Sequence, residues 1–110
     1  MRAALEKVMR TYGQAITLIS RESGKETRFA AFLQPVLKER EDLPAAATPL
    51  GAVSRQRWLY IGPAAREVLP GDRIHFDGIR LAVQETETVY LRSEALYKRA
   101  VLRQEKEAAG

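Results

Sequence analysis

The sequence predicts a mainly β protein: a small antiparallel β-barrel or sandwich of five to seven strands, with a short N-terminal helix and one long loop. Two observations support this prediction. Short runs rich in β-branched and aromatic residues recur along the chain, separated by Gly, Pro, Asp or Ser. The chain has 110 residues and neither an internal repeat nor a dividing linker, so we expect a single domain over residues 1–110.

The clearest local signal is Asp77-Gly78, which lies between two runs of alternating apolar residues. Asp-Gly favours a two-residue type I′ hairpin turn, because both central residues of that turn need positive φ. Such a turn sets the register of the two strands and gives one face to the core. The side chains on the core face are Ile74, Phe76, Ile79 and Leu81. The side chains on the opposite face are His75, Arg80 and Ala82.

The N-terminal residues 1–12 predict a short amphipathic helix. Apolar side chains recur there at helical spacing, and Gly13 stands where the helix would end. A helix of about a dozen residues is marginal alone in water, so its apolar stripe must dock on another surface. That surface is the domain itself, which we favour, or a partner protein.

Two strands are expected next, over Gln14–Ser20 and Thr27–Val36, joined by turn residues at Ser23-Gly24. The second strand is apolar on both faces, as in a closed or covered sheet. Pro35 has no amide hydrogen to donate, so it should lie at a strand end or a sheet edge.

Residues 38–50 interrupt the β pattern with a charge cluster, then Pro44, three alanines and Thr48-Pro49. A connection of this length in a compact domain is usually functional or disordered. Disorder and partner binding therefore remain as alternatives for this loop. If it binds a partner, the expected interface residues are Lys38, Glu39, Arg40, Glu41, Asp42, Leu43 and Pro44.

A further strand is expected over Ala52–Ile61, with Trp58 and Tyr60 on one face and Trp58 in the core. Gly62-Pro63 should end that strand, one helical turn could follow over Ala64–Leu69, and Pro70-Gly71 should turn the chain. Beyond the Asp77-Gly78 hairpin, residues 84–91 continue as a strand or begin another. Residues 93–103 fit two structures: a helix capped by Ser93, which propensity favours, or a last strand.

The composition offers little for catalysis, cofactor binding or metal binding. The chain has no cysteine, and its single histidine, His75, is flanked only by Asp72 and Asp77. A metal site needs several converging ligands, and a triad needs a nucleophile beside its base. No phosphate-binding glycine motif occurs. We therefore expect no enzyme activity, no cofactor and no metal, and the absence of a long apolar run predicts no membrane association.

The formal charge of +4 comes from 18 basic and 14 acidic residues. Along the sequence the arginines and lysines are scattered, with gatherings only at Arg55 with Arg57 and over residues 98–106. Scattered charge is typical of a solvated surface. A nucleic-acid-binding barrel of the SH3-like or OB kind is the alternative, and it would need clustered basic residues and exposed aromatics on one face.

Several stretches in order resemble a family of small head–tail joining proteins of siphovirus-like phages and defective prophages, similar to the stopper or adaptor proteins beneath the portal. The stretches are YGQAITLI from Tyr12, FAAFLQPV from Phe29, TPLG from Thr48, WLYIGP from Trp58 and LPGDRIHFDGIRLAVQETETVYL from Leu69. The resemblance spans Tyr12 to about Leu102.

The resemblance implies a β-barrel over residues 14–102, closed by a last strand and followed by a frayed tail over 104–110. It also implies a non-enzymatic protein that assembles as a ring of six or twelve copies. Such a ring docks on the portal or connector, offers a platform to the tail, and has DNA only as channel cargo. The expected location is the bacterial cytoplasm during assembly and then the virion or phage-like particle. A tail-terminator or tail-tube relative is an alternative that the sequence does not separate from this one.

Overall fold

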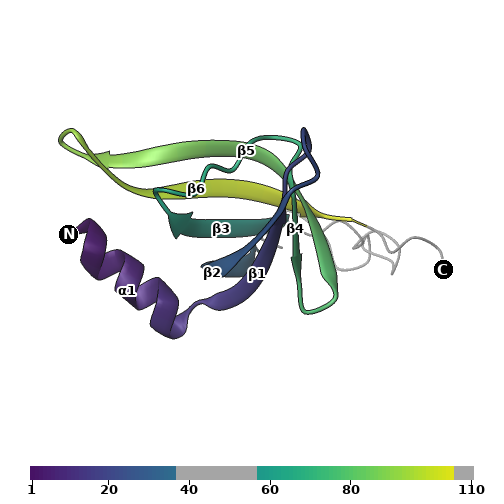
Figure 1. The fold of residues 1–110 in the computed structure, drawn as a ribbon, viewed down its shortest axis with the longest axis horizontal. Coiled ribbons are helices and arrows are strands. Elements are labelled where there is room, and N and C mark those ends of the chain that lie inside the picture. The colour runs from purple at the N-terminus through teal and green to yellow at the C-terminus, as the bar shows by residue number, and fades with distance from the viewer. Residues whose placement is uncertain (37–56, 106–110) are drawn as a thin grey trace, which may run out of the picture.

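The computed structural model describes residues 1–36 and 57–105. Over these residues the chain forms one helix and six strands (Figure 1). The elements are α1 (Arg2–Tyr12), β1 (Gln14–Ile19), β2 (Glu26–Val36), β3 (Arg57–Pro63), β4 (Arg73–Phe76), β5 (Ile79–Leu91) and β6 (Glu94–Gln104).

The six strands form a closed antiparallel barrel in the order β1-β2-β3-β6-β5-β4, and β4 pairs back onto β1. Three hairpins supply most of this order: β1 with β2, β4 with β5, and β5 with β6. Closure gives every strand two neighbours over at least part of its length, which removes the free edges of an open sheet. The predicted fold class is therefore confirmed.

The Asp77-Gly78 turn has the predicted geometry, with φ of 50° at Asp77 and 81° at Gly78. Phe76 pairs with Ile79, and Ile74 pairs with Leu81. Ile74 and Leu81 are fully buried, while Phe76 and Ile79 pack against the same core. The register that the turn predicts is thus confirmed on both strands.

The barrel interior holds one hydrophobic core, to which every strand contributes. The side chains that β3 sends into it are Trp58 and Tyr60, as predicted. The Trp58 ring meets the Phe76 ring edge-on at a centroid distance of 6.2 Å. Its indole N–H donates a hydrogen bond of 3.1 Å to Gln104 Oε1 at the end of β6. The largest core residue is thereby fixed by packing and by one polar contact.

Helix α1 docks on its own barrel, which confirms the favoured alternative. Met9 is only 1% exposed, and the helix contacts β2, β3 and β6. Figure 1 shows α1 lying beside the barrel at one end of the molecule. At eleven residues α1 lacks the length of a bilayer-crossing helix, and the described residues contain no other helix.

Pro35 lies one residue before the end of β2, opposite Trp58 on β3. On its other side β1 begins at Gln14, opposite Ala31, so Pro35 lies beyond the reach of β1. The Gln14 side chain extends the pairing by accepting a 2.8 Å hydrogen bond from the Leu33 N–H. The prediction that Pro35 occupies a strand end or local edge is confirmed.

Residues 93–103 form the last strand that the resemblance implies, and the helical alternative is wrong: β6 buries Leu96, Ala100 and Leu102, and pairing with β3 and β5 outweighs their helix propensity. Three predicted boundaries are corrected. The first is the start of the tail, because β6 reaches Gln104, which bonds to Trp58.

The other two corrections concern the end of β3. This strand includes Gly62 and Pro63, because Pro63 pairs with Tyr97 at a terminal position where no amide hydrogen is required. Over residues 64–69 the chain turns without forming the predicted turn of helix. Residues 38–50, 52–56 and 106–110 of the predicted loop, strand and tail lie outside the described residues.

Candidate functional site

The predicted interface residues lie outside the described part of the chain. They are Lys38, Glu39, Arg40, Glu41, Asp42, Leu43 and Pro44. The structure does show where that segment leaves and re-enters the barrel. Val36, the last residue of β2, is the direct register partner of Arg57, the first residue of β3. Residues 37–56 therefore connect two positions that a tight turn could join.

Four arginines gather on the outer surface of the barrel, and we call them the arginine face: Arg57, Arg73, Arg80 and Arg103. Register brings them together. Arg57 on β3 is opposite Arg103 on β6, Arg103 is opposite Ala82 on β5, and Ala82 is opposite Arg73 on β4. Arg80 lies two residues before Ala82, on the same side of β5. Each arginine is exposed and adjoins a buried residue, so all four point outward.

One carboxylate lies within the arginine face. Glu105 accepts two hydrogen bonds from Arg73, of 3.0 Å from Nε and 3.1 Å from Nη2. This bidentate contact raises the pKa of Arg73, first through the hydrogen bonds and then through the charge of Glu105. Among the described residues, Arg57, Arg80 and Arg103 take part in no ion pair. Over the described residues, the face therefore carries more positive than negative charge.

Sequence reasoning did not find this face. Its four arginines are separated by as many as 46 positions between Arg57 and Arg103 (103 − 57) and look scattered along the chain. The Asp77-Gly78 turn predicts that Arg80 is opposite His75, and this pairing is observed. The pairing of β3 with β6 joins distant segments, and no local signal specifies it. The charge pattern emerges only with the barrel order.

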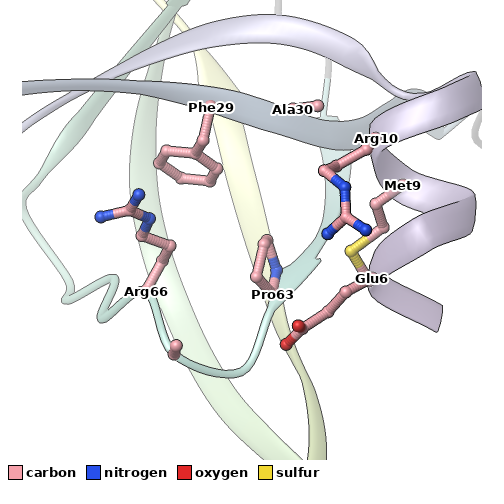
Figure 2. Close-up of a pocket in the computed structure, with 8 residues that line it drawn as sticks. Glu6, Met9, Arg10, Phe29, Ala30, Pro63 and Arg66 are labelled. Carbon is pink, nitrogen blue, oxygen red and sulfur yellow. The ribbon is translucent and has the colours of Figure 1, made fainter. Parts of the chain in front are cut away.

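A second feature is a hollow of about 280 Å³ between α1, β2 and the turn after β3 (Figure 2). Figure 2 shows Arg10 and Arg66 on opposite sides of it, with Phe29 and Pro63 between them. The Arg66 guanidinium stacks 5.3 Å from the centroid of the Phe29 ring. Glu6 also lines the hollow, and its carboxylate accepts a 3.1 Å hydrogen bond from Arg2. An apolar floor between two guanidinium groups suits an apolar side chain next to a carboxylate.

The β5–β6 hairpin ends in an exposed apolar tip. Tyr90 is 60% exposed and Leu91 is 46% exposed. No described strand pairs with the last rungs of this hairpin from outside, because β4 pairs with β5 only through Ala82 and β3 pairs with β6 only through Tyr97. At the turn, Arg92 has a φ of 61°, which is uncommon for a residue with a side chain. Figure 1 shows the tip extending past the end of β3.

Chemistry-bearing side chains do not converge in the described part of the chain. Over residues 1–36 and 57–105, no group of three or more His, Cys, Asp or Glu residues is placed to hold a metal ion. His75 is half-buried on the outer face of β4 between Thr17 and Arg80. Asp72 is buried, and its carboxylate has a structural role because it accepts hydrogen bonds from the Arg21 and Leu69 N–H groups.

No protein-family model matches this chain, and a search of curated proteins finds no match.

Tyr60 is a buried phenol whose hydroxyl has no hydrogen-bond partner among the described residues. Burial raises the pKa of Tyr60, and the nearby positive charge of Arg66 opposes this only in part. The folded state thus favours the neutral phenol. Its contribution to stability is complete below the unfolded pKa of about 10 and is lost as pH rises above that value.

The free energy of unfolding should therefore fall by up to about 1.4 kcal/mol per pH unit above about pH 10 through this group. Tyr60→Phe should remove that part of the fall and change stability by less than about 1 kcal/mol at pH 7, since no hydrogen bond is lost. Denaturant unfolding at pH 7, 10 and 11 measures both effects. Tyr12→Phe, at a 75% exposed tyrosine, is the control and should keep the wild-type pH dependence.

Proposed function

We propose that this protein is a non-enzymatic structural component of the head–tail junction of a phage or prophage. In this proposal several copies, six or twelve, form a ring that docks on the portal or connector and offers a platform to the tail. The motifs that carry the resemblance to head–tail joining proteins include all of β1, most of β2, nearly all of β3 and the β4–β5 hairpin. They thus supply much of the barrel wall.

The observation that carries the proposal is the direct pairing of Val36 with Arg57. A hairpin between these two residues needs only a turn of two to five residues, yet the chain places residues 37–56 there. A connection so much longer than this pairing requires favours a role in contacting another molecule, as proposed for Lys38–Pro44.

Two further surfaces support assembly with other proteins. The hairpin tip exposes Tyr90 and Leu91, and the hollow beneath α1 combines an apolar floor with Arg10 and Arg66. Exposed apolar side chains on a projecting element are typical of contact surfaces. The hairpin tip extends toward the end of the molecule where α1 begins (Figure 1). That end could therefore face a neighbouring copy or a neighbouring ring.

Shortening the insertion tests the proposal. Replacing residues 38–50 by a brief Gly/Ser turn should leave the barrel folded, because β2 and β3 pair from Val36 and Arg57 onward. Incorporation into particles should be abolished, because the partner contact is lost. Quantitative mass spectrometry of particles purified from the induced source bacterium measures incorporation, and circular dichroism with denaturant unfolding measures folding.

The matched control replaces the same residues by a Gly/Ser segment of equal length, which keeps the length but removes the side chains. Both variants should be excluded from particles while remaining folded. Unfolding of the shortened protein would show that the insertion is part of the fold and would contradict this assignment. Absence of the wild-type protein from intact tailed particles would contradict the virion role itself. Copurification with the portal, as opposed to the tail tube, separates this proposal from a tail-terminator role.

A further inference from the structure

We infer that the arginine face binds the phosphate backbone of duplex DNA without reading its sequence. This inference goes beyond the proposed function, because it assigns a ligand to a surface that assembly into a ring does not require. It rests on the register of four strands, which brings four arginines together. It also rests on the lack of exposed aromatic and amide side chains among the described residues between those arginines.

The spacing of the arginines suits a run of phosphates. Neighbouring strands lie about 4.8 Å apart, so Arg57 and Arg103 are about 5 Å apart at their backbones, and Arg103 and Arg73 about 10 Å apart. Long guanidinium side chains extend that reach. Duplex DNA presents one charge for about every 1.7 Å of its axis, so a row of this length meets several phosphates.

Arg57 and Arg103 are direct register partners on neighbouring strands, so two positive charges are opposite each other. Like charges directly opposite each other on neighbouring strands destabilise a sheet. No described carboxylate pairs with either arginine, and Glu105 is engaged with Arg73. The pair therefore gains nothing from the described residues around it. An external anion that bridges the two guanidinium groups would turn the repulsion into binding energy.

The composition of the face favours a phosphate backbone over other partners. Reading bases, or binding single strands, needs exposed aromatics or amides that reach base edges. In the row of paired residues that runs across β3, β6, β5 and β4, the residue between Arg103 and Arg73 is the small Ala82. Protein interfaces centre on apolar side chains. In the described part of the chain, Val36 lies at the rim of the face beside Arg57, whereas the exposed pair Tyr90 and Leu91 lies at the tip of the β5–β6 hairpin.

Glu105 supplies an internal competitor. Its carboxylate occupies Arg73 by two hydrogen bonds, in the manner in which a phosphate would. Removing its charge should free Arg73 for DNA. A Glu105→Gln substitution should therefore strengthen DNA binding, the opposite of what an unrelated structural disturbance would do. Glu85 and Glu26 lie outside this contact, farther along β5 and on β2.

The experiment measures binding of the full-length protein to two unrelated DNA duplexes of about 20 base pairs by fluorescence anisotropy between 50 and 200 mM NaCl. Both duplexes should bind equally, and the logarithm of affinity should fall against the logarithm of salt with a slope of about −3. Each of Arg57→Gln, Arg80→Gln and Arg103→Gln should reduce the slope by about 1. Glu105→Gln should tighten binding about threefold and steepen the slope toward −4. Lys7→Gln, at an exposed lysine on α1, is the control and should change neither quantity.

Absence of binding at 50 mM salt would overturn the inference, as would equal losses in Lys7→Gln and the arginine-face variants. Displacement of DNA by polyglutamate at equal charge concentration would also overturn it, because the face would then accept any acidic chain. Equal retention of a single-stranded probe would contradict the assignment to duplex DNA. The test uses purified protein alone, so its failure leaves the head–tail proposal standing. Exclusion from particles would likewise leave DNA binding untouched.

Discussion

Trp58→Ala is expected to lower the free energy of unfolding by about 3–5 kcal/mol, the range found when a large core aromatic is truncated. Trp58 is only 8% exposed and belongs to the central core. The substitution removes its edge contact with Phe76 and leaves Gln104 Oε1 without its indole donor. The cavity would open where β3 meets β6, in the wall of a closed barrel that cannot collapse by moving one free strand.

Denaturant unfolding followed by circular dichroism measures this effect, since the variant lacks the only tryptophan of the chain. Trp58→Phe keeps an aromatic ring and loses the hydrogen bond, so it should cost about 1–2 kcal/mol. Gln104→Ala should cost about 1 kcal/mol, because only the polar contact is lost. A cost below about 1 kcal/mol for Trp58→Ala would mean that the ring is dispensable for the core.

Much of the barrel could be predicted from local patterns. Asp77-Gly78 specified the β4–β5 register because the turn type fixes which residues face each other. The alternation over Trp58–Ile61 identified the buried face of β3. The helical spacing of Leu5, Val8, Met9 and Tyr12 predicted an apolar stripe on α1, of which Met9 is buried while Val8 and Tyr12 are exposed. In each case the information lies within a few residues. Short-range sterics and burial therefore determine the outcome.

Other features depend on contacts between distant segments. Helix propensity over 93–103 conflicted with burial of Leu96, Ala100 and Leu102, and the pairing of β6 on both edges decided in favour of the strand. The same pairing places Arg103 beside Arg57 and creates the arginine face. A sequence read locally cannot supply either result, because the order of strands around the barrel is a property of the whole chain.

In the candidate site, too, some features follow from local sequence and others from contacts between distant segments. The composition of residues 38–50 marks an unusual connection, and the Val36–Arg57 pairing shows that its two ends lie where a tight turn could join them. What Lys38–Pro44 contact remains a proposal. For Asp72, the sequence LPGD suggested only a turn near His75. In the structure its carboxylate joins two loops, because it accepts hydrogen bonds from the Arg21 and Leu69 N–H groups.

Asp72→Ala is the second substitution with a large expected effect, about 2–4 kcal/mol of destabilisation. Asp72 is 5% exposed, and its two carboxylate oxygens accept separate backbone hydrogen bonds. Oδ1 accepts from the Arg21 N–H at 3.0 Å, where β1 ends, and Oδ2 accepts from the Leu69 N–H at 2.9 Å. Alanine would leave both donors unpaired in partly buried positions.

The backbone of Asp72 adds to the effect. Its N–H donates to the Leu69 carbonyl, and its own carbonyl accepts from the Val83 N–H, just where β5 leaves the reach of β4. Side chain and backbone together thus hold the β1 end, the turn before β4 and the middle of β5 at one point. Loosening that point should weaken the barrel closure between β1 and β4, which pair over only three residues, Thr17 to Ile19 on β1.

Asp72→Asn is the matched control. An amide keeps the shape and one acceptor oxygen, so one of the two N–H groups retains its partner and the cost should be about half of that for alanine. Hydrogen exchange of the Arg21 and Leu69 amides, together with denaturant unfolding, distinguishes the two variants. Alanine should accelerate exchange at both amides, whereas asparagine should accelerate it mainly at one. Equal stability of Asp72→Ala and wild type would mean that water replaces the carboxylate at both donors, and that barrel closure does not depend on this residue.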